Sequence, residues 1–411
     1  MTNLTAMPEL SASAALPPPR GYWAVAMRKL LRPLLVKLCV LYIAAVLVIS
    51  VLVPFIATGK PYIISLHTAH GLVTRYPLFA DLTTRDYLTF LTAGMLIALA
   101  AIWRLTARVD LLRRRKLRWV SALTCISATV IAGVLVASLH HNQFDGTNYR
   151  HLMKSGRATG AIFAPIPWGY AQMEPLGRQA VNEMPSWRHW LGTDRSGRDV
   201  LSRMLWASRV AMGIGFVSQF IALSLGIIVG ALMGYFSGVC DILGMRIVEM
   251  VEAIPTFFLI LTFIAVFGRS TLMIMIILGV TGWTGYARFL RAEFLRIRQL
   301  DYIVAARASG APLHSVLFRH MLPNGLTPVL VSASFGLAGA VTIESSLSYL
   351  GIGVRPPTPS WGGMLNAAGN PATVFHWFQA LPPGFVLFLT VLAFNLVGEA
   401  LRDAIDPRSF S

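Results

Sequence analysis

Residue types that can catalyse a reaction occur in this chain, but none has the spacing of a catalytic motif. The sequence has no Gly-x-x-x-x-Gly-Lys-Ser/Thr phosphate loop, no His-Glu-x-x-His zinc motif and no Gly-x-Ser-x-Gly nucleophile motif. His140 and His141 are typical of a membrane interface, and His189, between Trp187 and Trp190, of a packed loop. We therefore predict that the chain is not an enzyme and holds neither a metal nor a cofactor.

Two carboxylates, Glu344 and Glu399, lie near the ends of long apolar runs. Carboxylates inside a membrane mark proton or ion pathways, so they favour one functional hypothesis, a secondary transporter. Against this hypothesis, both residues lie at the ends of their runs, and the chain shows no inverted repeat. The secondary transporter is kept as an alternative.

A third kind of chemistry, binding to another protein, is indicated by the segment Asp301–Asn324, which we name the polar hairpin. It has the sequence DYIVAARASGAPLHSVLFRHMLPN and lies between two long apolar runs. Asp301 can cap a short helix, Gly310 can end it, and Pro312 can begin a second helix that ends near Leu322. The segment therefore predicts two short helices that meet at a glycine.

The surface of the polar hairpin favours docking. Ala305, Ala306 and Gly310 have almost no side chain, so a partner can approach their backbone closely. The contact would be surrounded by Arg307, Arg319 and His320. The alternative, which the residues leave equally open, is an amphipathic elbow that only joins two membrane spans.

Composition shows what kind of protein must position these residues. The chain is 55% hydrophobic and 13% charged, with a mean hydropathy of +0.63, whereas soluble domains carry about a quarter charged residues. We therefore predict an all-α, polytopic protein of the lipid bilayer. The net charge of +17 is spread over membrane flanks without a recognition motif, which argues against nucleic-acid binding. Cys39, Cys125 and Cys240 lie in apolar runs and indicate no disulfide framework.

About eight transmembrane helices are expected, since a span needs roughly 20 apolar residues. Uncharged runs begin near Leu38, Tyr87, Trp119, Val210, Ala253, Ser270, Met321 and Trp377, and the run from Ala253 to Gly268 is the shortest. The predicted organisation is a tail at 1–36, a first span at 37–58, an external segment at 59–140 containing a helix pair at 87–103 and 119–139, an external loop at 141–208, and a membrane core at 209–411 with a cytoplasmic loop at 288–322.

The orientation follows from lysine and arginine, which cytoplasmic loops retain. The segment Arg104–Arg118 has seven basic residues and one acid, and the loop Arg288–His320 has six arginines. Placing both inside also puts Arg28, Lys29 and Arg32 inside, together with Arg402 and Arg408. We therefore predict that the N- and C-termini are cytoplasmic.

The polar hairpin resembles the Glu-Ala-Ala-x3-Gly-x9-Ile-x-Leu-Pro loop of ABC-importer permeases. Val304 departs from the family's Glu, and His320 departs from its Ile; the lost carboxylate affects an ion pair with the ATPase rather than docking itself. By resemblance, the hairpin is the coupling helix that docks on a separate ATPase subunit, which binds the ATP. The residues assigned to it are Asp301, Tyr302, Val304, Ala305, Ala306, Arg307, Gly310, Leu322 and Pro323.

Further motifs from about residue 185 onwards resemble permeases for dipeptides, oligopeptides and nickel. They are HWLGTDRSGRDVLSRMLWASRV from His189, GYFSG from Gly234, ESSLSYLGIGVRPPTPSWGGML from Glu344 and LTVLAFNLVGEALRDAIDPR from Leu389. Gly21 and the long external segment also resemble the branch for oligopeptides and microcin C. The turns and tryptophans of the first motif suggest an element at the external mouth of the path, with candidate residues Trp190, Gly192, Asp194, Gly197 and Asp199.

The resemblance implies a type I ABC-importer permease in a bacterial inner membrane. Its expected partners are a homologous second permease, two ATPases and an external solute-binding protein. Its expected solute is a peptide, with nickel or another small solute as the alternative. The solute itself and the residues that line its path do not follow from the motifs.

Two features stay open at this level. The runs from Tyr87 and Trp119 form an inserted helix pair, for which we favour a peripheral lipid-facing position over a role in the solute path, because no ionisable residue lies at mid-membrane. GIIVGALMG, from Gly226 to Gly234, has small residues four apart that fit close helix packing, either within the subunit or against a second permease.

Overall fold

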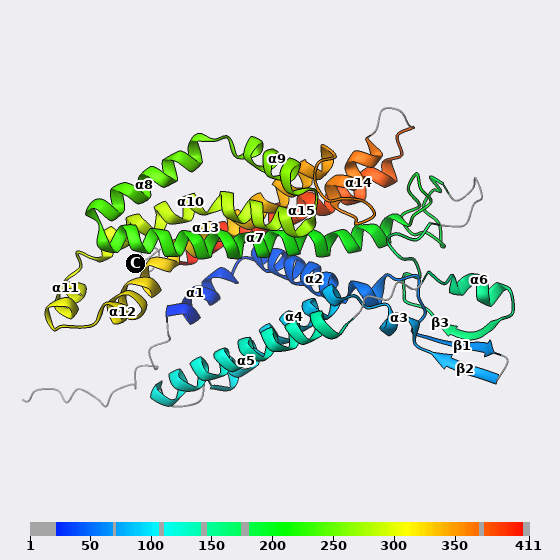
Figure 1. Ribbon diagram of the computed structural model, residues 1–411, viewed down its shortest axis with the longest axis horizontal. Helices are drawn as coiled ribbons and strands as arrows, with labels where there is room; N and C mark the ends of the chain where they lie inside the picture. The colour runs from blue at the N-terminus through cyan, green and yellow to red at the C-terminus, as the bar shows by residue number, and fades with distance from the viewer. Residues whose placement is uncertain are drawn as a thin grey trace, which may run out of the picture.

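The apolar runs form long helices, because a helix satisfies its own backbone hydrogen bonds in a medium without water. The computed structural model describes residues 22–68, 71–106, 111–140, 146–173, 181–369 and 374–405. The described helices, drawn in Figure 1, are α1 Tyr22–Leu30, α2 Leu34–Ile56, α3 Pro77–Ala80, α4 Thr84–Leu105, α5 Leu111–Leu139, α6 Tyr149–Lys154, α7 Val200–Phe236, α8 Gly238–Ala253, α9 Thr256–Phe267, α10 Thr271–Ile297, α11 Asp301–Ala308, α12 Leu313–Ser315, α13 Leu322–Tyr349, α14 Trp361–Ala368 and α15 Trp377–Ile405, with a π-helix at Val316–Met321 between α12 and α13.

Among the described residues there are seven candidate membrane spans, or eight if one bent helix pair is counted as a span, and eight were expected. These seven helices are long and apolar enough to cross a membrane. The eighth span, expected from Ala253, is not one straight helix: α8 and α9 pass the same test only together and are bent by 78°. The bend lies at Ile254 and Pro255, where a proline cannot continue the hydrogen bonding of α8. The all-α polytopic prediction is confirmed for the membrane helices.

The long helices run along one direction and give the molecule two distinct ends (Figure 1). We name the end formed by α1, the C-terminal end of α4, the N-terminal end of α5, the polar hairpin and the C-terminal end of α15 the hairpin end. The opposite end, which carries the β-strands, α6 and α14, is the sheet end. The described parts of the four basic groups of the sequence thus lie at the same end, as a single membrane orientation requires.

A small antiparallel sheet, which the sequence analysis did not predict, forms the far part of the sheet end. Its strands are β1 Ile63–Thr68, β2 Gly71–Arg75 and β3 Ala158–Ile162, in the order β2-β1-β3. Ile64 pairs with Arg75 in β2, and Ile63 pairs with Ile162 in β3. Residues on both sides of the inserted helix pair therefore meet in one sheet.

The centre of the bundle is the contact between α7 and α10, and glycine makes it close. A Cβ atom on Gly230 would lie 2.5 Å from the carbonyl oxygen of Ala287, and one on Gly234 would lie 2.5 Å from the Cβ of Phe294. A Cβ atom on Gly226 would likewise lie 2.5 Å from the Cβ of Tyr286. The small-residue stripe therefore packs within the subunit, which decides between the two alternatives for GIIVGALMG.

The inserted pair, α4 and α5, packs mainly on itself at the side of the bundle (Figure 1). Within α4 the one buried residue is Asp86, while most apolar side chains of both helices face outward. The pair is therefore peripheral within the subunit for most of its length, and lipid contact stays a prediction. The basic segment Arg104–Arg118 is mostly helical, since α4 ends at Leu105 and α5 begins at Leu111, with 107–110 outside the described residues.

Candidate functional site

The polar hairpin turns at Gly310. The backbone N–H of Ala311 donates to the carbonyl of Ala306 at 3.0 Å, and the backbone N–H of Gly310 donates to the carbonyl of Arg307 at 3.1 Å. Together these two bonds form a Schellman motif at the end of α11. Gly310 has φ +78°, a left-handed conformation that only glycine adopts without strain. The prediction that Gly310 ends the first helix agrees with this geometry.

Two expectations about the hairpin's helices were wrong. Asp301 is not the N-cap of α11: that position is Leu300, and Asp301 lies in the first turn, where its charge still complements the helix dipole. The second helix does not end near Leu322, because α12, the π-helix and α13 run on as one continuous element. Pro323 explains the widened π-turn, since it has no N–H and its ring would clash with the carbonyl of Arg319 in a regular α-helix.

Three buried side chains fix the hairpin to the bundle, and its outer face is left open. Ile303, Val316 and Met321 are at most 1% exposed and pack into the core cluster that contains Phe294 on α10. The hairpin is therefore a rigid extension of the bundle. The exposed hairpin residues are Asp301, Tyr302, Val304, Ala305, Arg307, Ala308, Ser309, Gly310, Pro312, Leu313, His314, Phe318, Arg319, Pro323 and Asn324, with Ala306, His320 and Leu322 partly covered.

At the sheet end, residues 181–199 form what we name the mouth segment, and its aspartates are used internally. Asp194 accepts hydrogen bonds from the backbone of Ser196 at 2.8 Å and Arg198 at 3.0 Å, and also from the Arg198 side chain at 2.8 Å. Asp199 is the N-cap of α7 and accepts from the Ser202 N–H at 2.6 Å. Residues 200–208, which we expected to belong to the external loop, are the first turns of α7.

Asp199 also holds His189, and both side chains are buried. Nδ1 of His189 lies 2.9 Å from the Asp199 carboxylate, and the imidazole lies against Trp168 with ring centroids 4.4 Å apart. Arg150 covers Trp168, with its guanidinium carbon 3.6 Å from the ring centroid. Burial and the neighbouring Arg188 lower the pKa of Arg150 to about 10, so it still carries its charge at neutral pH. His189 is thus a packed residue, as its sequence context predicted.

The glycines of the mouth segment are structural as well. Gly192 has φ +73°, and a Cβ there would lie 2.3 Å from the Glu183 carbonyl and 2.8 Å from the Phe378 ring. Gly197 has φ +70° in the turn that Asp194 closes. Of the five candidate mouth residues, Trp190 is therefore the one with a largely exposed side chain, and it has a neighbour, Trp187, that is 99% exposed.

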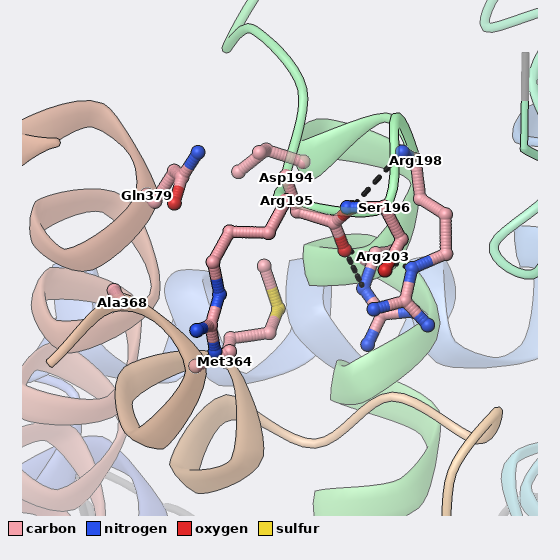
Figure 2. A pocket seen from close by; sticks show the side chains of 10 residues that line it. Asp194, Arg195, Ser196, Arg198, Arg203, Met364, Ala368 and Gln379 are labelled. Carbon is pink, nitrogen blue, oxygen red and sulfur yellow. Dashed lines mark hydrogen bonds and ion pairs between the residues drawn. The ribbon is translucent and has the colours of Figure 1, made fainter. Parts of the chain in front are cut away.

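A cavity of about 240 Å³ lies between the mouth segment, the start of α7, α14 and the start of α15 (Figure 2). In Figure 2, Asp194 is joined by dashed lines to Arg198 and Arg203, whose contacts measure 2.8 Å and 3.5 Å. Gln379 of α15 donates to the carbonyl of Thr193 at 2.8 Å and so ties the mouth segment to the bundle. The lining residues are Asp194, Arg195, Ser196, Arg198, Val200, Arg203, Met364, Ala367, Ala368 and Gln379.

The two intramembrane carboxylates have different surroundings. Glu344 on α13 is fully buried and accepts hydrogen bonds from Ser348 at 2.7 Å and Ser345 at 3.3 Å. Glu399 on α15 is exposed. These two residues do not form a common site. Glu344 therefore has a packing environment rather than that of an open pathway.

Ionic groups that the sequence analysis did not single out lie between α8 and α10. Arg291 pairs with Asp241, with a second contact at 2.7 Å, and Arg288 pairs with Glu252 at 2.7 Å. The sequence does contain a signal for these pairs. Asp241 and Glu252 lie three helical turns apart, so both carboxylates lie on one face of α8. These pairs connect the bent span to the central helix.

Comparison with known proteins relates this architecture to a transport family. The model of the family described as binding-protein-dependent transport system inner membrane component matches residues 226–411. The dipeptide transport system permease protein of Alkalihalophilus pseudofirmus is 34% identical over 250 residues, which cover 60% of this chain and 81% of that protein. The chain belongs to this family. It is thus a permease subunit of a binding-protein-dependent ABC importer, and the family setting argues against a secondary transporter.

Other relatives of the permease share the same region. The glutathione transport system permease protein of Pectobacterium atrosepticum is 38% identical over 228 residues, covering 56% of this chain and 75% of that protein. The oligopeptide transport system permease protein of Haemophilus influenzae is 36% identical over 220 residues, covering 54% and 70%. A solved chain of the MetNI methionine ABC transporter, in inward-facing conformations, is similar with 19% identity and a TM-score of 0.41, covering 50% of this chain and 96% of that chain.

Proposed function

We propose that this permease forms the translocation path of a peptide importer together with a second, homologous permease. Two separate ATPases bind the ATP, and an external binding protein delivers the solute. The membrane is a bacterial inner membrane, with both termini and the hairpin end in the cytoplasm. The described parts of all four basic groups lie at the hairpin end, which supports this orientation (Figure 1).

The observation that carries the proposal is the structure of the polar hairpin. Its anchors Ile303, Val316 and Met321 are buried, so force applied to the hairpin is transmitted to α10 and α13. Its outer face exposes the apolar side chains of Val304 and Phe318, together with the small residue Ala305. Exposed apolar side chains outside a membrane usually mark a protein contact, so this face is suited to docking. Closure of the ATPase pair would thus move membrane helices through this contact.

The mouth segment supports the proposed contact with the external binding protein. Trp187, Trp190 and Met184 are exposed on one short segment at the sheet end, and tryptophan is the residue most enriched at the centres of protein interfaces. The carboxylates of Asp194 and Asp199 are turned inward, so they shape the segment rather than touch the partner. The delivering protein is therefore expected to contact the tryptophans.

Uptake by the complete importer in proteoliposomes tests the proposed solute class. Dipeptides and oligopeptides should be imported in an ATP-dependent manner, and a Ni²⁺ salt should not compete with them. ATP-dependent Ni²⁺ uptake without peptide uptake would replace the peptide by the alternative solute. Uptake by the permease alone, without ATPases, would contradict the importer itself.

A further inference from the structure

The cavity beside the Asp194 turn has more positive than negative charge. Among the described residues that line it are three arginines, Arg195, Arg198 and Arg203, but only one carboxylate, that of Asp194. Asp194 is already shared between Arg198 and Arg203. The cavity is therefore suited to an anion, because the described lining residues leave one guanidinium without a counter-charge.

Arg195 is that guanidinium. In Figure 2 its side chain extends away from the Asp194 pairs and ends near Met364 and Ala368. Among the described residues, no ion pair or hydrogen bond forms on this side chain, although it is partly buried. Arginine that loses water without gaining a partner costs free energy, so the position favours a ligand that supplies one.

We propose that this cavity is a carboxylate subsite, in which Arg195 binds the C-terminal carboxylate of the peptide as it enters the path. The guanidinium offers a planar pair of N–H donors that matches a carboxylate. Met364, Ala367 and Ala368 supply an apolar wall for the last side chain of the peptide. This inference rests on the proposed function, because it takes the solute to be a peptide.

The size of the cavity agrees with recognition of a peptide end. Its volume of about 240 Å³ is below the range of roughly 300–1,000 Å³ typical of sites that enclose a whole ligand. A C-terminal carboxylate is present on every unmodified peptide, whatever its sequence. One fixed arginine can therefore serve many solutes, while the rest of each peptide stays outside the subsite.

The test compares uptake of one tetrapeptide with uptake of its C-terminal amide, in the complete importer. The preference is defined as the uptake rate of the tetrapeptide divided by the uptake rate of its amide. The measured ratio is this preference for Arg195→Gln divided by the preference for the unmodified permease. Any preference of the binding protein itself is the same in both and cancels. Arg157→Gln is the matched control, because Arg157 is an exposed arginine at the sheet end that does not line the cavity.

Arg195→Gln should lower the ratio about fivefold to tenfold, as expected for one charge-assisted hydrogen-bonded pair near water. Arg195→Lys should keep most of the preference, Arg195→Ala should behave like Arg195→Gln, and Arg157→Gln should change nothing. An unchanged ratio in both Arg195→Gln and Arg195→Ala overturns the inference alone. If the uptake rates of both peptides fall equally and the binding protein associates more weakly, Arg195 pairs with an acidic side chain of that protein instead. That result also overturns the inference. Failure of the unmodified importer to take up either peptide contradicts the proposed function itself.

Discussion

Asp86 and Arg209, separated by 123 positions in the chain, form an ion pair that joins the inserted helix pair to the bundle. Asp86 also closes the capping box of α4 through the Thr83 N–H at 2.6 Å, and Arg209 donates to Thr89 at 2.8 Å. One carboxylate therefore sets both the start of α4 and its attachment to α7. Since Asp86 lies at the first turn of a candidate span, we expect the membrane boundary to cross α7 near Arg209, with the preceding turns of α7 outside the membrane.

Replacing Asp86 by Asn should loosen this attachment. Loss of one partner from a buried ion pair leaves the other charge uncompensated, which costs about 3 kcal/mol. A lower temperature of thermal unfolding in detergent is expected, and Arg209→Gln should lower it by a similar amount. Arg246→Gln is the control, because its pair with Glu249 is solvent-exposed and contributes about 1 kcal/mol or less. Equal effects at both pairs would show that Asp86 does not anchor α4.

Labelling with a membrane-impermeant thiol reagent tests the orientation. In a variant without its three native cysteines, a cysteine at Leu111 should be protected in intact cells, because the proposed topology places the basic α4–α5 junction in the cytoplasm. A cysteine at Arg157 should react. Arg157 is preferred to Tyr149, whose side chain is only 6% exposed and would be unreactive in either orientation. The reverse labelling pattern would reject the proposed topology.

Gly310→Asp should uncouple the permease from its ATPase. The substitution places a side chain at φ +78°, which costs roughly 1–2 kcal/mol, on the surface proposed to meet the partner. Co-purifying ATPase should fall, or hydrolysis should continue without uptake, while the chain still inserts into the membrane. Val304→Glu, which restores the family residue, should be tolerated.

The control for Gly310→Asp is Gly160→Asp. Gly160 also has a positive φ, +65°, and open space around a Cβ, but it lies in β3 at the opposite end. It should impose similar strain without loss of ATPase. Normal ATPase retention and normal uptake in Gly310→Asp would reduce the hairpin to an elbow.

The contact between α7 and α10 should not tolerate even one added methyl group. Gly230→Ala places a Cβ 2.5 Å from the Ala287 carbonyl oxygen, so the helices must separate, at a cost of about 1–3 kcal/mol. Gly285→Ala on α10 meets nothing within 4 Å and should be neutral or stabilising by up to about 1 kcal/mol. Unfolding midpoints in detergent measure both. Equal stability of the two variants would place the glycine stripe outside the subunit core.

Two residues of the mouth segment should respond differently to mutation. Trp187→Ala removes an exposed side chain, so it should weaken association of the binding protein while the assembled complex keeps its stability. Asp199→Ala removes the N-cap of α7 and the partner of His189, so it should lower the yield of folded permease. Binding measured on the assembled complex and yield by size-exclusion chromatography separate these effects. Unchanged binding in Trp187→Ala counts against the tryptophan contact.

The sequence by itself determined the membrane class, the approximate spans and the position of the hairpin. These are local properties: hydrocarbon thickness requires a run of about 20 apolar residues, and Gly310 marks a turn wherever it stands. The family resemblance rested on equally local motifs and was confirmed by the comparison. The T-x-x-D pattern at Thr83 and Asp86 is also a local signal, because it is typical of a capping box, which the structure has at the start of α4.

The tertiary structure decided which distant residues meet. Whether the glycines from Gly226 to Gly234 pack inside the subunit, and whether Asp194 faces a partner or its own turn, depends on contacts that sequence spacing does not encode. The same is true of the pair between Asp86 and Arg209, because a carboxylate can satisfy its charge with any cation that the fold brings near. The continuation of the hairpin into α13 follows from packing, which overrides the local signals for where a helix begins and ends.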